Sequence, residues 1–152
     1  MNYWLMKSEP NEFGIDDLFN KTDRTEHWDG VRNYQARNMM RDAMKLGDQV
    51  FFYHSNCDEP GIVGIMEVVR EGYPDFLAFD PNDKHFDPKS SPDNPRWFMV
   101  DVKYVKKLSR TLTLKELKSH PQLEELALVR RGNRLSIMPV SKQQWDFILS
   151  LE

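Results

Sequence analysis

The segment WDGVRNYQARN, residues 28–38, concentrates groups that could recognise a nucleobase. It contains one Trp, one Tyr, two Asn, one Gln and two Arg. Similar groups occur at other expected element ends: Lys7-Ser8-Glu9, His54-Ser55-Asn56 and Arg96-Trp97. Bases stack on aromatic faces, worth about 1–3 kcal/mol per base, and hydrogen-bond through their edges with amides and hydroxyls. If the strands curl together, these segments could converge on one rim as a closed pocket for a flipped base.

Trp28 and Trp97, the two tryptophans in these segments, can also be interpreted as core residues. Trp is usually mostly buried in folded proteins, and spacing alone slightly favours a partly buried position for Trp28 and Trp97. Sequence spacing does not separate the two interpretations, so both stay open.

Other kinds of chemistry lack their sequence patterns. The histidines form no H-x-x-x-H motif and Cys57 is the single cysteine, so we expect no metal site. Cys57 lies beside Asp58 and Glu59, which disfavour a thiolate, and no G-x-S-x-G motif marks a serine nucleophile. The stretch Gly61-Ile62-Val63-Gly64 is too short and too apolar for a phosphate loop. We therefore expect no cofactor.

Length and composition indicate a single domain spanning residues 1–152. Hydrophobic residues make up 39% and charged residues 30%, which is enough for one core. No apolar run approaches the roughly 18 residues of a membrane span, and the N-terminus does not resemble a secretory signal. The lone cysteine excludes an internal disulfide. These features predict a cytosolic or nuclear protein, with a cytoplasmic monomer as the default expectation.

Charge is distributed unevenly along the chain. Residues 1–95 carry a net charge of −8 and residues 96–142 a net charge of +7, within a total of −3. A basic segment can attract an anionic partner through its local field. The alternative is a solvated surface that balances the acidic part, and charge alone favours that alternative.

The elements that must position these groups predict an α+β fold. Apolar and β-branched runs predict strands at 3–6, 49–53, 61–69, 96–105 and 135–140. Periodicity, capping boxes and a Pro predict helices at 15–19, 33–44, from 113, at 121–131 and from 141. Residues 74–95, with five prolines, predict a long loop that its aromatics Phe76, Phe79 and Phe86 pin onto the body. About five or six strands would form a curled mixed sheet or small barrel with helices around it.

The ordered segments resemble the EVE domain, a PUA-like family related to the YTH and ASCH domains. The resemblance covers nearly the whole chain: YWLMKSEP at 3–10, WDGVRNYQARN at 28–38, GDQVFFYHSN at 47–56, GIVGIMEV at 61–68, YPD at 73–75, AFDP at 78–81, DPKS at 87–90, PRWFMVDV at 95–102 and RLSIMPVS at 134–141. It implies a small PUA-like β-barrel surrounded by helices, no catalysis, and recognition of a modified base, notably a modified cytosine, in DNA or RNA.

The resemblance also implies roles for particular residues. Trp28 corresponds to the first wall of an aromatic cage, with Trp97 or Phe98 as the second wall. The polar lining would be Lys7, Ser8, Asn33, Tyr34, Gln35, Ser55 and Asn56. Phosphates would be held by Arg32, Arg37, Arg130, Arg131 and Arg134.

Three functional hypotheses follow. The first is a non-enzymatic module that reads a modified base in nucleic acid. The second is a sensor that takes a modified nucleoside or another small heterocycle into the same pocket, which the modest acidity of the whole chain allows. The third is an enzyme acting on a nucleobase or RNA, for which Asp29 is the nearest carboxylate. The sequence does not identify the modified base or choose between DNA and RNA.

Overall fold

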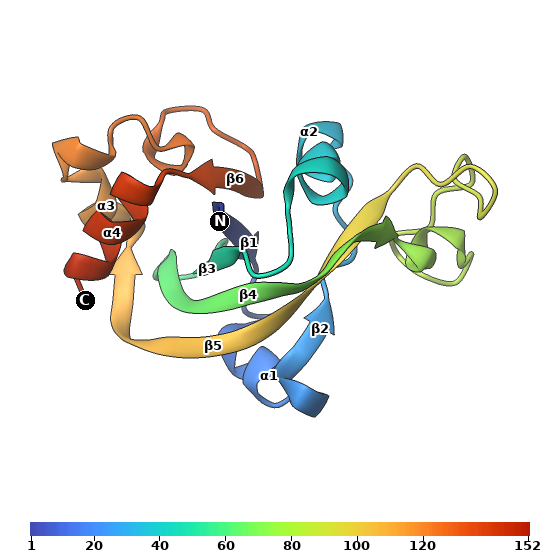
Figure 1. Ribbon diagram of the computed structural model, residues 1–152, viewed down its shortest axis with the longest axis horizontal. Helices are drawn as coiled ribbons and strands as arrows, with labels where there is room; N and C mark the ends of the chain where they lie inside the picture. Colours follow the sequence, from blue (N-terminus) through green and yellow to red (C-terminus); the bar gives the residue numbers. More distant parts are fainter.

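Six strands form one mixed sheet in the structure, a computed structural model that describes residues 1–152. They are β1 (Tyr3–Ser8), β2 (Thr25–His27), β3 (Gln49–His54), β4 (Gly61–Pro74), β5 (Phe98–Thr113) and β6 (Ile137–Val140). Their order is β2-β5-β4-β3-β1-β6, in which β1 and β3 run parallel and all other neighbours antiparallel. The sheet curls strongly along β4 and β5 but stays open between β2 and β6 (Figure 1). The predicted α+β fold is confirmed, as a barrel-like sheet that does not close.

Short helices surround the sheet. The α-helices are α1 (Ile15–Phe19), α2 (Tyr34–Asn38), α3 (Leu114–Lys118) and α4 (Lys142–Ser150). A π-helical turn follows α2 at Met39–Ala43, and 3-10 turns lie at Thr22–Arg24, Phe76–Phe79, Pro121–Leu123 and Ala127–Val129. None of the helices has the length and apolar character that crossing a lipid bilayer requires.

The two longest strands, β4 and β5, extend further than their sequence patterns predict. β4 has 14 residues and β5 has 16, and their pairing shifts register at four places. Glycine permits the tight curl: a Cβ on Gly64 would lie 2.7 Å from Ile15 Cδ1 and 2.8 Å from the Lys106 carbonyl oxygen. Gly64 therefore permits a close backbone approach, because any side chain there would push α1 and β5 away.

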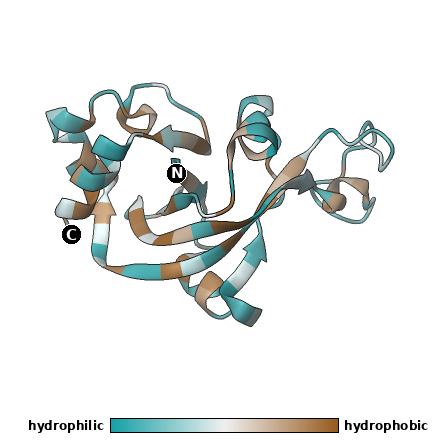
Figure 2. Cartoon of the chain, in the orientation of Figure 1, coloured by the Kyte–Doolittle hydropathy of each residue, from teal (hydrophilic) through white to brown (hydrophobic).

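Two hydrophobic clusters cover opposite faces of the sheet. Alternation along the strands separates them: Met6 and Phe52 belong to one cluster, and Leu5 and Phe51 to the other. The first cluster includes residues of α1 and α2, and the second includes residues of α3 and α4. Apolar positions accordingly follow β4 and β5 in bands (Figure 2). Trp28 belongs to the first cluster, which places the β2 end beside α1 and α2.

The predicted helix at 121–131 is wrong. The segment forms two separate 3-10 turns, and Leu123, Leu126 and Leu128 are all buried. On a straight α-helix, residues two positions apart point about 200° away from each other. A continuous helix could not bury both Leu126 and Leu128 against the same core, whereas two turns can. Strand β2 was also missed, because Thr25–His27 is short and polar.

Candidate nucleic-acid interface

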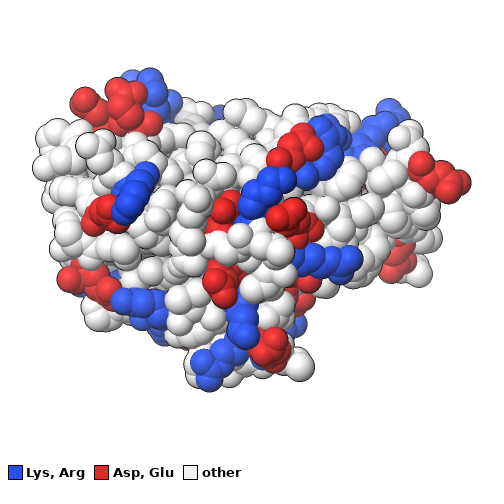
Figure 3. Space-filling view, in the orientation of Figure 1, with Lys and Arg blue, Asp and Glu red and all other residues white.

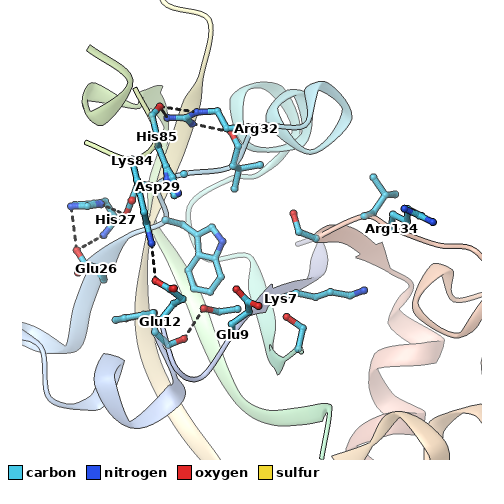
Figure 4. Close-up of a pocket in the computed structure, with 18 of the residues that line it drawn as sticks. Lys7, Glu9, Glu12, Glu26, His27, Asp29, Arg32, Lys84, His85 and Arg134 are labelled. Carbon is cyan, nitrogen blue, oxygen red and sulfur yellow. Dashed lines mark hydrogen bonds and ion pairs between the residues drawn. The ribbon is translucent and has the colours of Figure 1, made fainter. Parts of the chain in front are cut away.

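An open hollow of about 780 Å³ lies where the ends of β1, β2 and β3 meet the segment before β6 and the long loop (Figure 4). We call it the first hollow. It brings together six of the residues selected from the sequence: Lys7, Ser8, Trp28, Arg32, Ser55 and Arg134. Convergence of the strand-end segments on one rim therefore holds for β1, β2 and β3.

The other residues selected from the sequence lie outside the first hollow. They are Asn33, Tyr34, Gln35, Arg37, Asn56, Trp97, Phe98, Arg130 and Arg131. In their place, the wall contains Glu12, His27, Asp29, Gly30, Lys84 and His85. Among these residues the sequence singles out only Asp29, as the nearest carboxylate for an enzyme. Lys84 and His85 have no such signal, because they belong to a distant polar loop that carries no motif to place it here. Asp29 and Gly30 had the signal of direct adjacency to Trp28.

Trp28 is both a core residue and a wall of the first hollow. Its backbone N–H donates to the Val100 carbonyl at 2.8 Å, which continues the pairing of β2 with β5. Phe13 and Phe52 meet its ring edge-on, with centroids 6.2 and 5.5 Å away. The residue is 7% exposed. Trp28 is therefore a core residue and a pocket residue at once, because the core fixes its side chain and the side chain still lines the hollow.

Hydroxyl and ammonium groups line the β1–β3 side of the hollow. Ser8 Oγ donates to the Phe13 carbonyl at 2.6 Å, so it fixes the loop after β1. Ser55 extends the pairing of β3 with β1 through its backbone N–H, which donates to the Ser8 carbonyl, and its hydroxyl makes no hydrogen bond within the protein. Lys7 is half-buried with no ion-pair partner, and burial lowers the pKa of its ammonium. Ser55 and Lys7 are therefore available as donors to a ligand.

Ion pairs occupy the carboxylates of the opposite side. Lys84 reaches from the long loop to Glu12 at 2.7 Å, and His27 Nδ1 lies 2.9 Å from Asp29 Oδ1 (Figure 4). The Lys84 ammonium holds the pKa of Glu12 below its usual range. Glu26 pairs with Lys21 at 3.0 Å. The carboxylates remain acceptors toward a neutral ligand, because each carries more lone-pair sites than these contacts use.

The residues around Trp97 form a cluster outside the first hollow, and this cluster joins the start of α2 to the long loop. Trp97 is buried, donates its indole N–H to Asp87 at 2.6 Å and stacks on Tyr34 with centroids 4.8 Å apart. This hydrogen bond lowers the pKa of Asp87. Asn33 caps α2, since its side-chain oxygen accepts from the Ala36 N–H at 2.9 Å. The structure thus places Asn33 and Tyr34 at the exposed start of α2 and Trp97 against Tyr34, and none of the three lines the hollow.

Arg32 attaches the long loop to the body of the protein. Its Nη1 donates to the fully buried Asp75 at 3.0 Å, and its Nε and Nη2 donate to the His85 carbonyl at 3.2 and 2.7 Å. The guanidinium also lies 5.4 Å from the Trp97 ring. Of the aromatics predicted to pin this loop, Phe76 packs edge-on against His27 at the end of β2, with ring centroids 5.3 Å apart, while Phe86 is 39% exposed. A polar clamp centred on Arg32 adds a second attachment of the loop to the body.

The long loop completes the first hollow by packing His85 on Gly30. Gly30 has a φ of +81°, and a Cβ there would lie 2.7 Å from the His85 ring. The Gly30 N–H donates to Asp75 at 2.9 Å, so the same buried carboxylate joins both segments. His85 Nδ1 is buried without a hydrogen-bond partner in the protein. A glycine is required here for its backbone angle and for contact with the loop.

Gly30→Ala is expected to destabilise the protein more than Gly132→Ala. Both glycines have positive φ, +81° and +80°, but a Cβ on Gly132 would meet nothing within 4 Å. Gly132→Ala should therefore show only the backbone penalty, about 1–2 kcal/mol, while Gly30→Ala also displaces His85. Urea unfolding measures both free energies. Equal losses for the two variants would contradict the packing role of Gly30.

Charge over the visible face does not form a large patch of one sign. Lys and Arg lie interspersed with Asp and Glu over the sheet and the helices (Figure 3). The structure also contains no group of His, Cys, Asp and Glu residues arranged to hold a metal ion. Within the first hollow, Lys7 and Arg134 have no ion-pair partner, so both are available to attract an anion.

Comparison with known proteins identifies close relatives. Residues 2–151 match the model of the EVE domain. Thymocyte nuclear protein 1 from rat is 50% identical, over 99% of this chain and 74% of the relative, and the human protein is 49% identical over the same shares.

Solved structures agree with these relationships. The human THYN1 protein in complex with DNA containing 5-methylcytosine superposes with a TM-score of 0.94 at 48% identity, covering 99% of this chain and 97% of the human one. A protein from Pseudomonas syringae gives 0.93 at 50% identity, with 98% of each chain covered. An ASCH protein from Zymomonas mobilis, at 11% identity and a TM-score of 0.58, shares only the fold. From the match over residues 2–151 and these identities, the chain belongs to the EVE domain family.

Proposed function

We propose that this protein binds DNA through a modified cytosine, with 5-methylcytosine as the principal candidate, and performs no chemistry on it. The observation that carries the proposal is the human relative, 48% identical, whose crystal structure contains 5-methylcytosine DNA. The base would leave the duplex stack and enter the first hollow, since within the duplex its pairing edge is hydrogen-bonded to the opposite base and both of its faces are stacked. Trp28 would provide the stacking surface.

The shape and rigidity of the hollow support this role. Its volume of about 780 Å³ falls in the range of small-ligand sites. Trp28 is fixed by the core and by the Val100 carbonyl, so its ring needs no ordering when a base binds. An aromatic surface that is already ordered loses little conformational entropy on binding. Phe13, Val31 and Leu135 add apolar wall next to which a methyl group could be buried.

The polar groups of the hollow match the edge of cytosine. Cytosine presents one amino donor and two acceptors along its pairing edge, and carboxylates are suited to the amino group. Asp29 and Glu9 supply carboxylate oxygens in the hollow, and Lys7 and Ser55 supply donors. We assign the acceptor role to Asp29, whose His27 partner fixes its orientation. We assign to Ser8 and Arg32 the support of the wall, because their donors are engaged within the protein.

Titration of matched oligonucleotides tests the proposal. Fluorescence anisotropy at low salt would compare duplexes that contain one 5-methylcytosine or one cytosine at the same position. Burial of one methyl group is worth about 0.8 kcal/mol, so the methylated duplex should bind about fourfold more tightly. Equal affinity for both duplexes would refute modified-base reading. Binding of free 5-methyl-2′-deoxycytidine as tightly as the duplex would instead support a nucleoside sensor.

A further inference from the structure

A second hollow of about 810 Å³ lies beyond Lys7, which lines both hollows. The end of α3, the 3-10 turn at Pro121–Leu123 and the turn at 130–133 form its walls. Lys7 is the last but one residue of β1, so it stands at the border between the two spaces. A ligand that extends out of the first hollow on this side meets the second one next.

The two hollows differ in charge. In the first, four carboxylates face five cations, and most of these charges are paired. The second is lined by Lys7, Lys118, Arg130 and Arg131 against the single carboxylate of Glu124. Lys118 and Arg131 have no ion-pair partner, and Arg130 has only a weak exposed contact with Glu125 at 3.4 Å. The first hollow suits a nearly neutral base, and the second suits an anion.

The turn at 130–133 adds backbone donors to this cationic wall. The Asn133 N–H closes the turn on the Arg130 carbonyl at 3.3 Å, while the N–H groups of Arg131 and Gly132 have no acceptor within the protein. Gly132 has a φ of +80°, and a Cβ there would meet nothing within 4 Å, so the backbone is open to close approach. Asn133 Nδ2, buried in the same wall, also lacks an acceptor. Unpartnered N–H groups beside a glycine are suited to bind phosphate oxygens.

Lys7 connects the two sites, and Arg134 lines the first hollow on the same side. Figure 4 shows both on one side of the first hollow, opposite Glu26 and His27. Lys7 lies 5.6 Å from the Tyr53 ring and has no carboxylate partner. A half-buried cation without a counterion is stabilised by an incoming anion. A phosphate placed over Lys7 would lie between the base in the first hollow and the unpaired cations of the second.

We propose that the second hollow binds the phosphodiester backbone of the nucleotides that flank the base held in the first hollow. The inference rests on the proposed function for the identity of the ligand. It adds the direction of the strand, which leaves the first hollow over Lys7 and runs past the turn at 130–133. Lys118 and Arg131 contact phosphates in the second hollow, and neither lines the first.

A double variant of the second hollow tests this assignment. Lys118→Ala with Arg131→Ala removes two phosphate contacts, so affinity for the methylated oligonucleotide should fall about tenfold at low salt and the salt slope should fall by about 1.5. The ratio of affinities for methylated and unmethylated oligonucleotides should stay unchanged. The matched control is Lys115→Ala with Lys45→Ala, which removes two exposed charges outside both hollows, one of them on the same helix α3.

The outcomes separate this inference from the proposed function. If the double variant keeps the wild-type affinity and salt slope, the second hollow does not bind phosphates. The same follows if the control variant loses as much affinity as the double variant. Loss of the methylation preference in the double variant would also overturn this assignment, because these residues would then act on the base. If the wild type shows no methylation preference but the double variant still lowers the salt slope, the second hollow stands and the base-reading proposal fails. Absence of any oligonucleotide binding would refute both.

Discussion

Trp28→Ala is expected to weaken binding of 5-methylcytosine DNA by roughly five- to 150-fold, the range that corresponds to the loss of one base stack. Trp28 is the only tryptophan that lines the first hollow, and the core holds its indole in place. Anisotropy titration of the methylated duplex measures the effect. Unchanged affinity would remove Trp28 from the site and leave it as a core residue only.

Stability must be separated from binding in this test, because Trp28 is 7% exposed. Truncating a buried Trp to Ala costs about 3–5 kcal/mol of folding free energy. Trp28→Phe keeps an aromatic face and a smaller void, so it should fold and show a smaller loss of affinity. Trp145→Phe is the matched control: this tryptophan is 5% exposed and lies in the other hydrophobic cluster. It should lose comparable stability and no affinity for DNA.

Arg32→Ala is expected to lower the free energy of unfolding by roughly 3 kcal/mol, because removal of one partner leaves a buried charge without compensation. Asp75 is 0% exposed and would keep only the backbone donors of Gly30 and Leu77. The His85 carbonyl would lose both of its guanidinium donors. We expect residues 76–95 to become sensitive to protease, and DNA affinity to fall, because Lys84 and His85 form part of the wall.

Two further variants define the origin of this effect. Arg32→Lys should recover little, because a single ammonium cannot donate to Asp75 and the His85 carbonyl in the same fork geometry. Arg37→Ala is the control, since Arg37 donates to the Arg96 carbonyl and the exposed Asn38 and touches no buried carboxylate. Urea unfolding and limited proteolysis provide the readouts. Equal destabilisation by the Arg32 and Arg37 changes would contradict the clamp.

Local sequence determined where three of the helices begin. Asn33, Thr113 and Ser141 cap their helices as their residue types predict, because a side-chain oxygen satisfies an N–H two or three positions away. Apolar runs predicted the strands at 3–6, 49–53 and 61–69, whereas the parallel pairing of β1 with β3 is seen only in the structure. Where burial competed with periodicity, as at 121–131, the local pattern failed, since the core and not the spacing decided which leucines are covered.

The candidate site divides in the same way. Lys7, Ser8 and Ser55, which end or follow β1 and β3, could be placed at one rim from sequence, because the ends of neighbouring parallel strands must meet, whereas Trp28 follows the strand β2, which the sequence patterns did not predict. The sequence could not show that Asn33, Tyr34 and Trp97 lie outside the site. An aromatic side chain that stacks on another aromatic, as Trp97 does on Tyr34, has the same residue type as one that stacks on a base.

The sequence by itself determined the family, the α+β class and the presence of aromatic and polar groups at strand ends. Only the tertiary structure decided which of these groups face the first hollow. That decision depends on the long loop, which Arg32 and Asp75 attach to the body across 43 positions of the chain. Contacts between residues so far apart are set by the packing of the whole sheet, and no local pattern encodes them. The division of charge between the two hollows arises for the same reason, because β1 brings Lys7 beside the turn at 130–133.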